Sequence, residues 1–537
     1  MSAAMRVEGD GWPRRTRVVG NAPVVVALVA VVLGLRAGGA GIDRRSLEVS
    51  WQLIDLGVLR DDPLGSIWYL HVQPPLYNLV VGSVLRWAPT PELGTLFVLY
   101  VVCLLVAGLL LTDLLVRWGV HPLLAGGVVA LSLTAPPLLS TIVHGSYEVP
   151  LAAMVVAATW LFQLHLDRPN GRHLLALSAV LTLLVMTRSL FHPAWLVIVL
   201  AMALVARPLP WRHVIAAALL PLVVIGGWAL KNQIVFGDPT MSSWVGFNLQ
   251  RGVVAPMAAD DVEDAVADGD VTPLAQIPPW LSLPNYDEVA EPCDPDDRHP
   301  AVEEAEKHEV PLEVANFNSS CFLPLYAESE ENASALIRRD PGRFVSSRRA
   351  SVVASFSINR IGQEDPGESF TGRRDPSTTW MDSLWGALYV PVDTTISMDD
   401  WNLPLLGLDE LPVEVSLSLV LGFLVVLART VVAVVRIARS GWRDRATAWS
   451  SEDVVWCLLG GTAVLVIVVS GLLEFGENGR FRSTIDPLLI ALPLGLVARW
   501  ASERLGWSRP RADEVASAEE PTGESVERTP EPTGAPS

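Results

Sequence analysis

Residues Gly94 to Val116 read GTLFVLYVVCLLVAGLLLTDLLV, a run that is apolar almost throughout. A helix of this length can cross the hydrocarbon core of a bilayer, which is roughly 30 Å thick. Apolar runs recur between Ala22 and Ala206 and again after Val413. The sequence therefore predicts an all-α polytopic membrane protein.

The composition of the 537-residue chain agrees with this class. Half of the residues are hydrophobic, only 18% are charged, and the mean hydropathy is +0.37. Soluble globular chains carry roughly 25% charged residues, so a soluble enzyme, a fibrous chain and a disordered scaffold are excluded. The formal charge of −19 argues against nucleic acid as a partner. Four cysteines are too few for a disulfide framework.

Ten of the apolar runs are predicted to cross the membrane. They are Ala22–Leu35, Gly94–Val116, Pro122–Ile142, Val149–Leu166, Leu174–Met186, Pro193–Ala206, Val214–Leu230, Val413–Val435, Val454–Leu473 and Ile485–Ala498. A further run, Pro75–Trp87, is about 13 residues long, short of the roughly 17 that a span needs. The run Leu174–Met186, which is predicted to span, is equally short. Length alone therefore does not decide whether Pro75–Trp87 crosses the membrane.

The distribution of arginine decides it, because short cytoplasmic loops collect Lys and Arg. If Pro75–Trp87 stays on the outer side, most arginines in the short loops face the cytoplasm. If it crosses, every later loop through Arg212 changes side and the charge rule fails repeatedly. We therefore expect Pro75–Trp87 to be an outer interfacial helix.

This topology divides the chain into five parts. They are a cytoplasmic N-terminus (1–20), a transmembrane module (21–230) with a first outer loop (38–93), an acidic extracytoplasmic domain (231–412), C-terminal membrane helices (413–500) and a disordered cytoplasmic tail (501–537). The small residues after Arg36 also fit a signal-peptide cleavage site, although Arg36 favours an uncleaved anchor. Either interpretation puts Gly41 onward outside.

Two cysteines, Cys293 and Cys321, lie in the extracytoplasmic domain. An oxidising exterior permits a bridge between them, and two free thiols are the alternative. The proline content of this domain predicts short helices joined by loops.

Polar residues beside the outer ends of membrane spans are candidate functional groups. In the first outer loop, Asp43, Glu48 or Asp55 could accept a proton from an attacking hydroxyl, or could be solvated loop acids. The turn from His144 to Glu148 places two titratable residues between apolar spans, and this desolvation cost points to a role for Glu148.

Three arginines are candidate phosphate ligands. Arg188 stands on the outer side against the charge bias, and snorkelling to headgroups is the alternative explanation. Arg480 and Arg482 belong to the crowded loop Glu474–Arg482, and cationic donors there suit a lipid-linked phosphate or pyrophosphate. Anchoring to ordinary lipid phosphates competes with that interpretation.

The order of these motifs resembles membrane glycosyltransferases of the GT-C class, which include protein O-mannosyltransferases and aminoarabinose transferases. The resemblance rests on the acidic first loop, the segment His71-Val72-Gln73-Pro74-Pro75-Leu76-Tyr77, the segment Lys231–Gly237, and Arg480-Phe481-Arg482 before Asp486-Pro487. It covers roughly residues 20–245 and 413–500. In this chain Val-Gln stands where the family's usual histidine precedes Pro-Pro.

The resemblance implies transfer of a sugar from a polyprenyl-phosphate donor to a glycan, lipid or protein acceptor on the outer face of the cell membrane. By position, Asp43 is the implied base with Glu48 in reserve, and Glu148 is the second acid. Arg188, Arg480 and Arg482 are expected to hold the donor phosphate. His71, Gln73, Tyr77, His144 and Tyr147 are expected to bind substrate. No cofactor is certain: some members use a divalent metal, and the sequence shows no strong ligand cluster.

Two other function classes stay open. A transporter or flippase of lipid-linked saccharides would carry broken spans and polar groups at the midplane, whereas the polar groups here gather at one face. A membrane scaffold with an acidic ectodomain would not need Glu148 or Arg480.

Overall fold

The computed structural model describes residues 18–37, 41–88, 92–308, 314–357, 389–397, 410–441, 445–473 and 478–507. The fold is mostly helical, with 73% of the described residues in helices. Among the described residues, six helices are long and apolar enough to cross a membrane. The predicted mostly helical fold is therefore confirmed, and its six long apolar helices are consistent with a membrane protein, whereas the count of ten spans is not confirmed.

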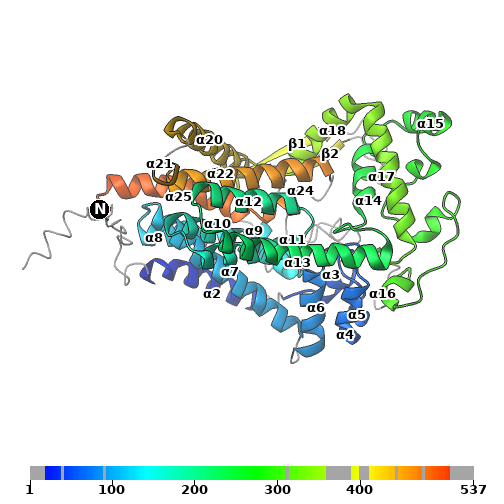
Figure 1. Cartoon of the computed structure of the whole chain (residues 1–537), viewed down its shortest axis with the longest axis horizontal. Coiled ribbons are helices and arrows are strands. Elements are labelled where there is room, and N and C mark those ends of the chain that lie inside the picture. The colour runs from blue at the N-terminus through cyan, green and yellow to red at the C-terminus, as the bar shows by residue number, and fades with distance from the viewer. Residues whose placement is uncertain are drawn as a thin grey trace, which may run out of the picture.

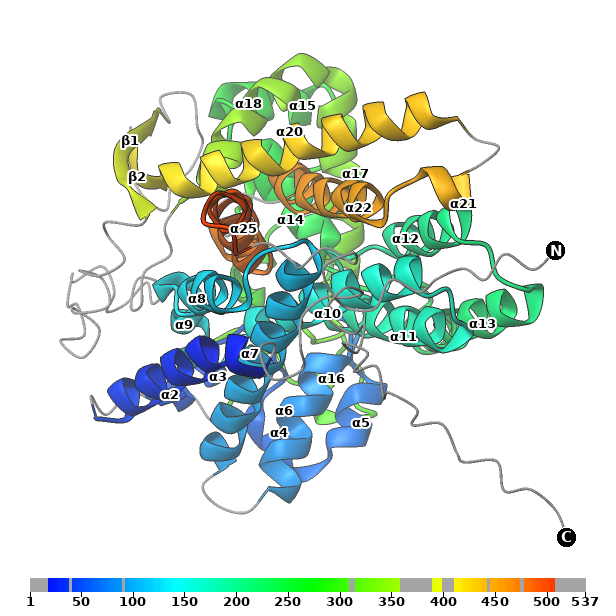
Figure 2. The same cartoon turned by 90° about the vertical axis from the view of Figure 1, so that its left-hand side faces the viewer.

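The helical bundle is formed by segments from both ends of the chain (Figures 1 and 2). Its helices are α2 (Ala22–Ala37), α7 (Glu92–Arg117), α8 (Pro122–Leu133), α9 (Pro136–Val143), α10 (Glu148–Asp167), α11 (Gly171–Thr187), α12 (Pro193–Ala206), α13 (Trp211–Phe236), α20 (Leu417–Ser440), α21 (Arg445–Ala448), α22 (Ser451–Val464), the π-helix η4 (Leu465–Val469), α23 (Ser470–Leu473), α24 (Asn478–Ser483) and α25 (Asp486–Arg504). Helix α10 packs against α7, α11 and α22, so it forms the centre of the bundle.

Two predicted spans have different bounds in the structure. The run Pro122–Ile142 is divided into α8 and α9, because Pro136 removes a helical donor and disfavours helical geometry at the preceding residue. The run that begins at Val413 starts as strand β2 (Glu410–Ser416), which pairs antiparallel with β1 (Pro391–Ser397). Helix α20 begins only at Leu417, where the Ser416 hydroxyl caps it.

Two groups of smaller helices lie at one end of the bundle (Figure 1). The first loop contains α3 (Arg44–Glu48), α4 (Leu56–Asp61), α5 (Pro63–Trp68) and α6 (Leu76–Trp87). The polar domain, residues 238–357, contains α14 (Val245–Val254), α15 (Ala259–Ala267), η1 (Pro273–Gln276), η2 (Leu283–Tyr286), α16 (Pro300–Glu303), α17 (Phe322–Arg339) and α18 (Pro341–Ala354). A disulfide joins Cys293 to Cys321 in this domain. The predicted tail beyond residue 507 lies outside the described residues.

Buried lysines tie the first loop to the rest of the protein. Lys231, near the end of α13, donates to the Leu70 carbonyl at 2.6 Å, and Lys307 donates to the Ser50 carbonyl at 2.6 Å. Both side chains are almost fully buried. Burial lowers the pKa of Lys307 to about 7. These contacts fix the first loop against α13 and the polar domain.

Helices α2 and α8 cross at a glycine. A Cβ atom on Gly126 would lie 1.9 Å from the Gly20 carbonyl oxygen, whereas a Cβ on the neighbouring Gly127 would meet no atom within 4 Å. We predict that Gly126→Ala lowers the unfolding free energy by about 1–3 kcal/mol, because the two helices must separate. Gly127→Ala is the matched control, and thermal unfolding in detergent is the measurement. Equal midpoints for the two variants would contradict this packing.

Candidate functional site

The candidate site is organised around Glu148, the first residue of α10. Its side chain is fully buried. The preceding turn is held by the hydroxyl groups of Tyr77 and Tyr100, which both donate to the Gly145 carbonyl, at 2.5 and 2.6 Å. Gly145 has a φ of 66°, in the left-handed region that favours glycine. Two tyrosines from α6 and α7 thus fix the backbone that carries Glu148.

Two arginines share one oxygen of Glu148. Arg188 Nη1, just after α11, lies 3.1 Å from Glu148 Oε1, and Arg480 Nε, on α24, lies 2.7 Å from the same atom. The two arginine side chains are 5% and 12% exposed. A buried carboxylate needs such partners, because an unpaired charge in a low-dielectric interior is costly. Segments 40 and 332 residues away along the sequence are therefore joined at Glu148.

Aromatic rings hold the Arg188 guanidinium in place. Its Cζ atom lies 3.7 Å from the centre of the Phe481 ring and 4.9 Å from the centre of the Tyr147 ring. Such cation–π contacts stabilise a desolvated guanidinium. Among the described residues, the Arg188 guanidinium donates a hydrogen bond only through Nη1, to Glu148. Its other N–H groups remain able to bind a ligand.

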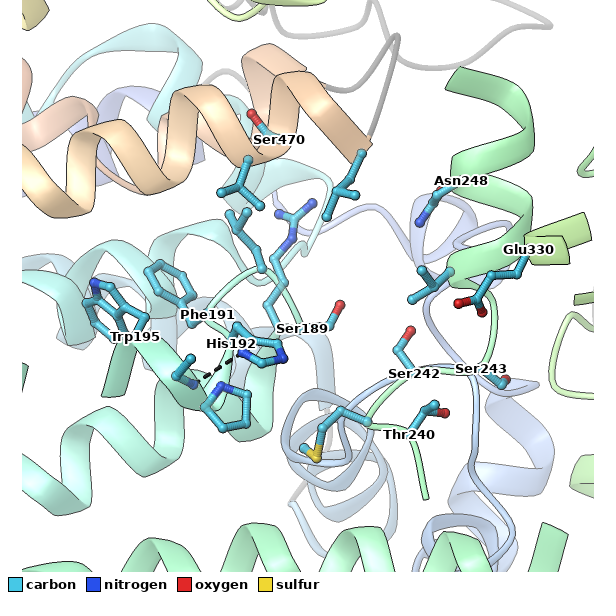
Figure 3. Close-up of a pocket in the computed structure, with 18 of the residues that line it drawn as sticks. Ser189, Phe191, His192, Trp195, Thr240, Ser242, Ser243, Asn248, Glu330 and Ser470 are labelled. Carbon is cyan, nitrogen blue, oxygen red and sulfur yellow. Dashed lines mark hydrogen bonds between the residues drawn. The ribbon is translucent and has the colours of Figure 1, made fainter. Parts of the chain in front are cut away.

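Arg188 and Phe481 also line a cavity of about 1880 Å³ between the bundle and the polar domain. Figure 3 shows part of its lining, with Trp195 on one side and Asn248 and Glu330 on the other. Side chains from α12, α13 and α22–η4 give it an apolar wall, and they include Trp195, Ile198, Met202, Ile225, Leu458 and Leu465. Polar side chains line the other part, and they include Ser189, Ser242, Ser243, Asn248 and Glu330. The cavity therefore combines a wall formed by membrane-type helices with a polar region beside Arg188.

The π-helix η4 contributes Leu465 and Val469 to the apolar wall. Single π-turns inside α-helices occur often at functional sites. In α22, one turn before η4, Gly461 also lines the cavity, and a Cβ atom built on it meets nothing within 4 Å. The wall is therefore open at this position.

Asp43 caps α3 rather than lining this cavity. Its carboxylate accepts from the backbone amides of Arg45 and Ser46, at 3.1 and 3.2 Å, and its side chain is exposed. The Asp43 amide donates to the Val143 carbonyl at 2.8 Å, which places the start of α3 beside the turn that carries Glu148. Glu48 is half-buried and pairs with Arg44 at 2.7 Å.

His71 is buried in a contact with the polar domain. Its Nδ1 lies 2.7 Å from the Ser243 hydroxyl, and its Nε2 lies 2.9 Å from the Asn318 carbonyl oxygen. Burial lowers the pKa of His71 to about 3, and the charge of Lys231 adds to this effect. Gln73 is also buried, and His144 is half-buried.

Arg482 contacts different residues from those that Arg188 and Arg480 contact. It is fully buried, pairs with Asp486 at 2.8 Å, and donates to the carbonyls of Ser355 and Ser357 at 2.8 and 2.6 Å. These contacts connect α24 and α25 to the end of α18. Its guanidinium is therefore occupied in joining the bundle to the polar domain. Neither Arg482 nor Arg480 lines the cavity.

The structure thus brings together Glu148, Arg188, Arg480, Tyr77 and Tyr147. It adds residues that the sequence did not single out. Gln52 accepts from Arg480 Nη2 at 3.4 Å, and Phe481 stacks on Arg188. Phe481 stands between two predicted phosphate ligands in the sequence, and this position could have indicated a role at the site. No local sequence pattern marks the polar cavity residues of α14 and α17. The predicted loop residues Glu474–Glu477 lie outside the described part of the chain.

No metal ligand set is present in the described ranges, where no three His, Cys, Asp or Glu side chains gather closely enough to hold an ion. The residues described therefore do not fit a divalent metal, and no chemical step is assigned to one. In comparisons with protein-family models, curated proteins and solved structures, none matches this chain.

The lowered pKa of His71 makes a prediction about pH and stability. In the unfolded chain histidine titrates near pH 6.5, so the unfolded state takes up a proton first as the pH falls. The contribution of neutral His71 to the unfolding free energy is fully present above about pH 6.5, and it is lost as the pH falls toward about 3. We expect the unfolding free energy to fall by roughly 1.4 kcal/mol per pH unit from this group.

The measurement is denaturant unfolding between about pH 7 and about pH 5. The variant His71→Gln removes the titrating group and should show a shallower pH dependence than the wild-type protein. Identical slopes for both proteins would mean that His71 is protonated in the folded state.

Proposed function

We propose that this protein is a membrane glycosyltransferase that moves a sugar from a polyprenyl-phosphate donor to an extracytoplasmic acceptor. One observation carries the proposal. A large cavity with an apolar wall of bundle helices contains, in its lining, an arginine whose remaining N–H groups can bind an anion. A long isoprenoid chain joined to a phosphate has the matching distribution of apolar and charged groups.

The arginines suit the electrostatics of this reaction. When the bond between the anomeric carbon and the phosphate oxygen breaks, negative charge grows on the departing lipid phosphate. Donors that are already fixed before the reaction stabilise such charge best, because they need no reorganisation. Glu148 and the rings of Tyr147 and Phe481 fix Arg188 in this way. Arg480, held by the same carboxylate, is proposed to assist.

The acceptor hydroxyl must also lose a proton. In the proposed reaction the acceptor oxygen bonds to the anomeric carbon, the lipid phosphate leaves with the bonding electron pair, and a carboxylate takes the hydroxyl proton. Asp43 is proposed for this role, because its backbone lies beside the Glu148 turn and its side chain is exposed. Glu148 is proposed to position the arginines, since both hold its oxygen.

The proposed location is the cell membrane, with the polar domain and the site on the extracytoplasmic face. The disulfide between Cys293 and Cys321 supports this side, because disulfides persist in oxidising compartments. A flippase is less favoured, because Arg188 caps the end of α11 and Glu148 begins α10. Transporters place their polar sites near the middle of the membrane-spanning segments.

The first test is sugar transfer in membranes that contain the protein. The donors are polyprenyl phosphates that carry radiolabelled mannose, glucose or arabinose. We expect incorporation into endogenous acceptors to fall at least about a hundredfold in Arg188→Ala and in Asp43→Asn, because each removes a group proposed to act in the transition state. Trp68→Ala, an exposed change in the first loop, is the control. Incorporation that is equal in all four proteins would discard the site, and none above empty membranes would discard the activity.

A second test concerns the apolar wall. Gly461→Trp places a large side chain in the cavity, and Gly227→Trp is the control, since Gly227 has equally open surroundings and does not line the cavity. We expect only Gly461→Trp to weaken the binding of undecaprenyl phosphate, by about tenfold, because the ring occupies the space of the lipid chain. Native mass spectrometry measures the bound fraction. Equal binding by both variants would place the lipid elsewhere.

A further inference from the structure

A pair of stacked tryptophans lies on the polar side of the protein, outside the candidate spans. Trp51 of the first loop stacks on Trp280 of the polar domain, with ring centres 5.4 Å apart and planes 11° from parallel. Phe317 meets the Trp51 ring edge-on at 5.3 Å. Trp51 is nevertheless 38% exposed. Because Trp280 covers one face of the Trp51 indole, a ligand can reach the ring only from its opposite face or its edge.

The backbone conformation and the buried indole N–H of Trp280 are energetically unfavourable. It has a φ of 71°, a left-handed conformation that a bulky residue rarely adopts. Its Nε1 is buried and has no acceptor among the described residues. Four aromatic rings, those of Trp51, Trp244, Phe247 and Phe317, contact it nonetheless. Strained residues of this kind concentrate at ligand-binding sites, where the surrounding structure over-determines them.

Trp51 is linked to the Glu148 cluster through the residue that follows it. Trp51 directly precedes Gln52, whose Oε1 accepts from Arg480 Nη2 at 3.4 Å. Arg480 in turn lies 2.7 Å from Glu148. The cavity reaches the same cluster through Arg188 and Phe481, and neither Trp51 nor Gln52 lines it. Donor and acceptor groups could therefore approach the cluster from two separate directions.

We propose that the exposed face of Trp51 binds a pyranose ring of the sugar acceptor. The axial C–H groups of a pyranose form an apolar face that packs on an indole ring, while its hydroxyl groups stay hydrated. An indole offers a large rigid surface for such a contact at low entropic cost. Trp280 fixes the orientation of the Trp51 ring from behind. This inference rests on the proposed function and names its acceptor class as a saccharide with a pyranose unit.

The test is saturation-transfer NMR on the full chain in phospholipid nanodiscs, where no sugar-headed detergent competes. The probes are methyl α-glucopyranoside, methyl α-mannopyranoside and methyl α-galactopyranoside. We expect transfer to the ring C–H protons of at least one probe, about tenfold weaker in Trp51→Ala and largely kept in Trp51→Phe, which retains an aromatic face. Trp68→Ala, which is 52% exposed before substitution and lies on the same loop, should match the wild-type protein.

Absence of transfer to all three probes in the wild-type protein would overturn the proposal, and so would equal transfer in the wild-type protein and Trp51→Ala. If Trp51→Ala does not fold, as judged by its unfolding midpoint, Trp51→Leu is tested instead. Leucine is also non-aromatic but fills more of the space of the indole than alanine does. Pyranoside binding needs no lipid donor. If the protein binds a pyranoside through Trp51 but shows no sugar transfer, the proposed function is wrong and the proposed saccharide site at Trp51 is retained.

Discussion

A carboxylate buried at the start of a bundle helix must be paired with positive charge, and this constraint shapes the region around it. Removing one partner of such a buried pair costs about 3–5 kcal/mol, because a charge is left without compensation. At Glu148 the pairing is met by Arg188 and Arg480. Helix α10, the end of α11 and the short helix α24 must therefore meet at one point. The same requirement leaves Arg188 fixed at the wall of the cavity, where we propose that it binds an anion.

The first loop and the polar domain are joined by a different set of contacts. His71, Lys231 and Lys307 are all buried, and each bonds to neutral groups of another segment rather than to a carboxylate. Burial keeps such groups from charging freely, which lowers the pKa of His71 and of Lys307. These contacts hold α3 beside the Glu148 turn and hold Trp51 against Trp280. The geometry proposed for transfer therefore depends on a loop that is anchored from two sides.

Much of the bundle could be predicted from the sequence, because apolar runs the length of a bilayer have few alternatives to helix. The break at Pro136 and the strand before Leu417 were missed, since hydropathy does not register local backbone geometry. The predicted topology placed Glu148 and Arg480 on the same side of the membrane, which grouped them as candidate site residues. Their contact depends on helix packing that a single sequence does not reveal. Arg480 and Arg482 look alike in the sequence. Only the fold shows that the Arg482 guanidinium pairs with Asp486 and donates to two backbone carbonyls.

We propose that a polyprenyl phosphate occupies the cavity with its phosphate on Arg188. The most direct test is a cryo-electron microscopy map of the protein in nanodiscs with undecaprenyl phosphate. We expect phosphate density within hydrogen-bonding distance of Arg188 and a lipid chain that runs between α12 and α22. Phosphate density on the opposite end of the bundle, or a lipid chain that leaves this cavity empty, would contradict it.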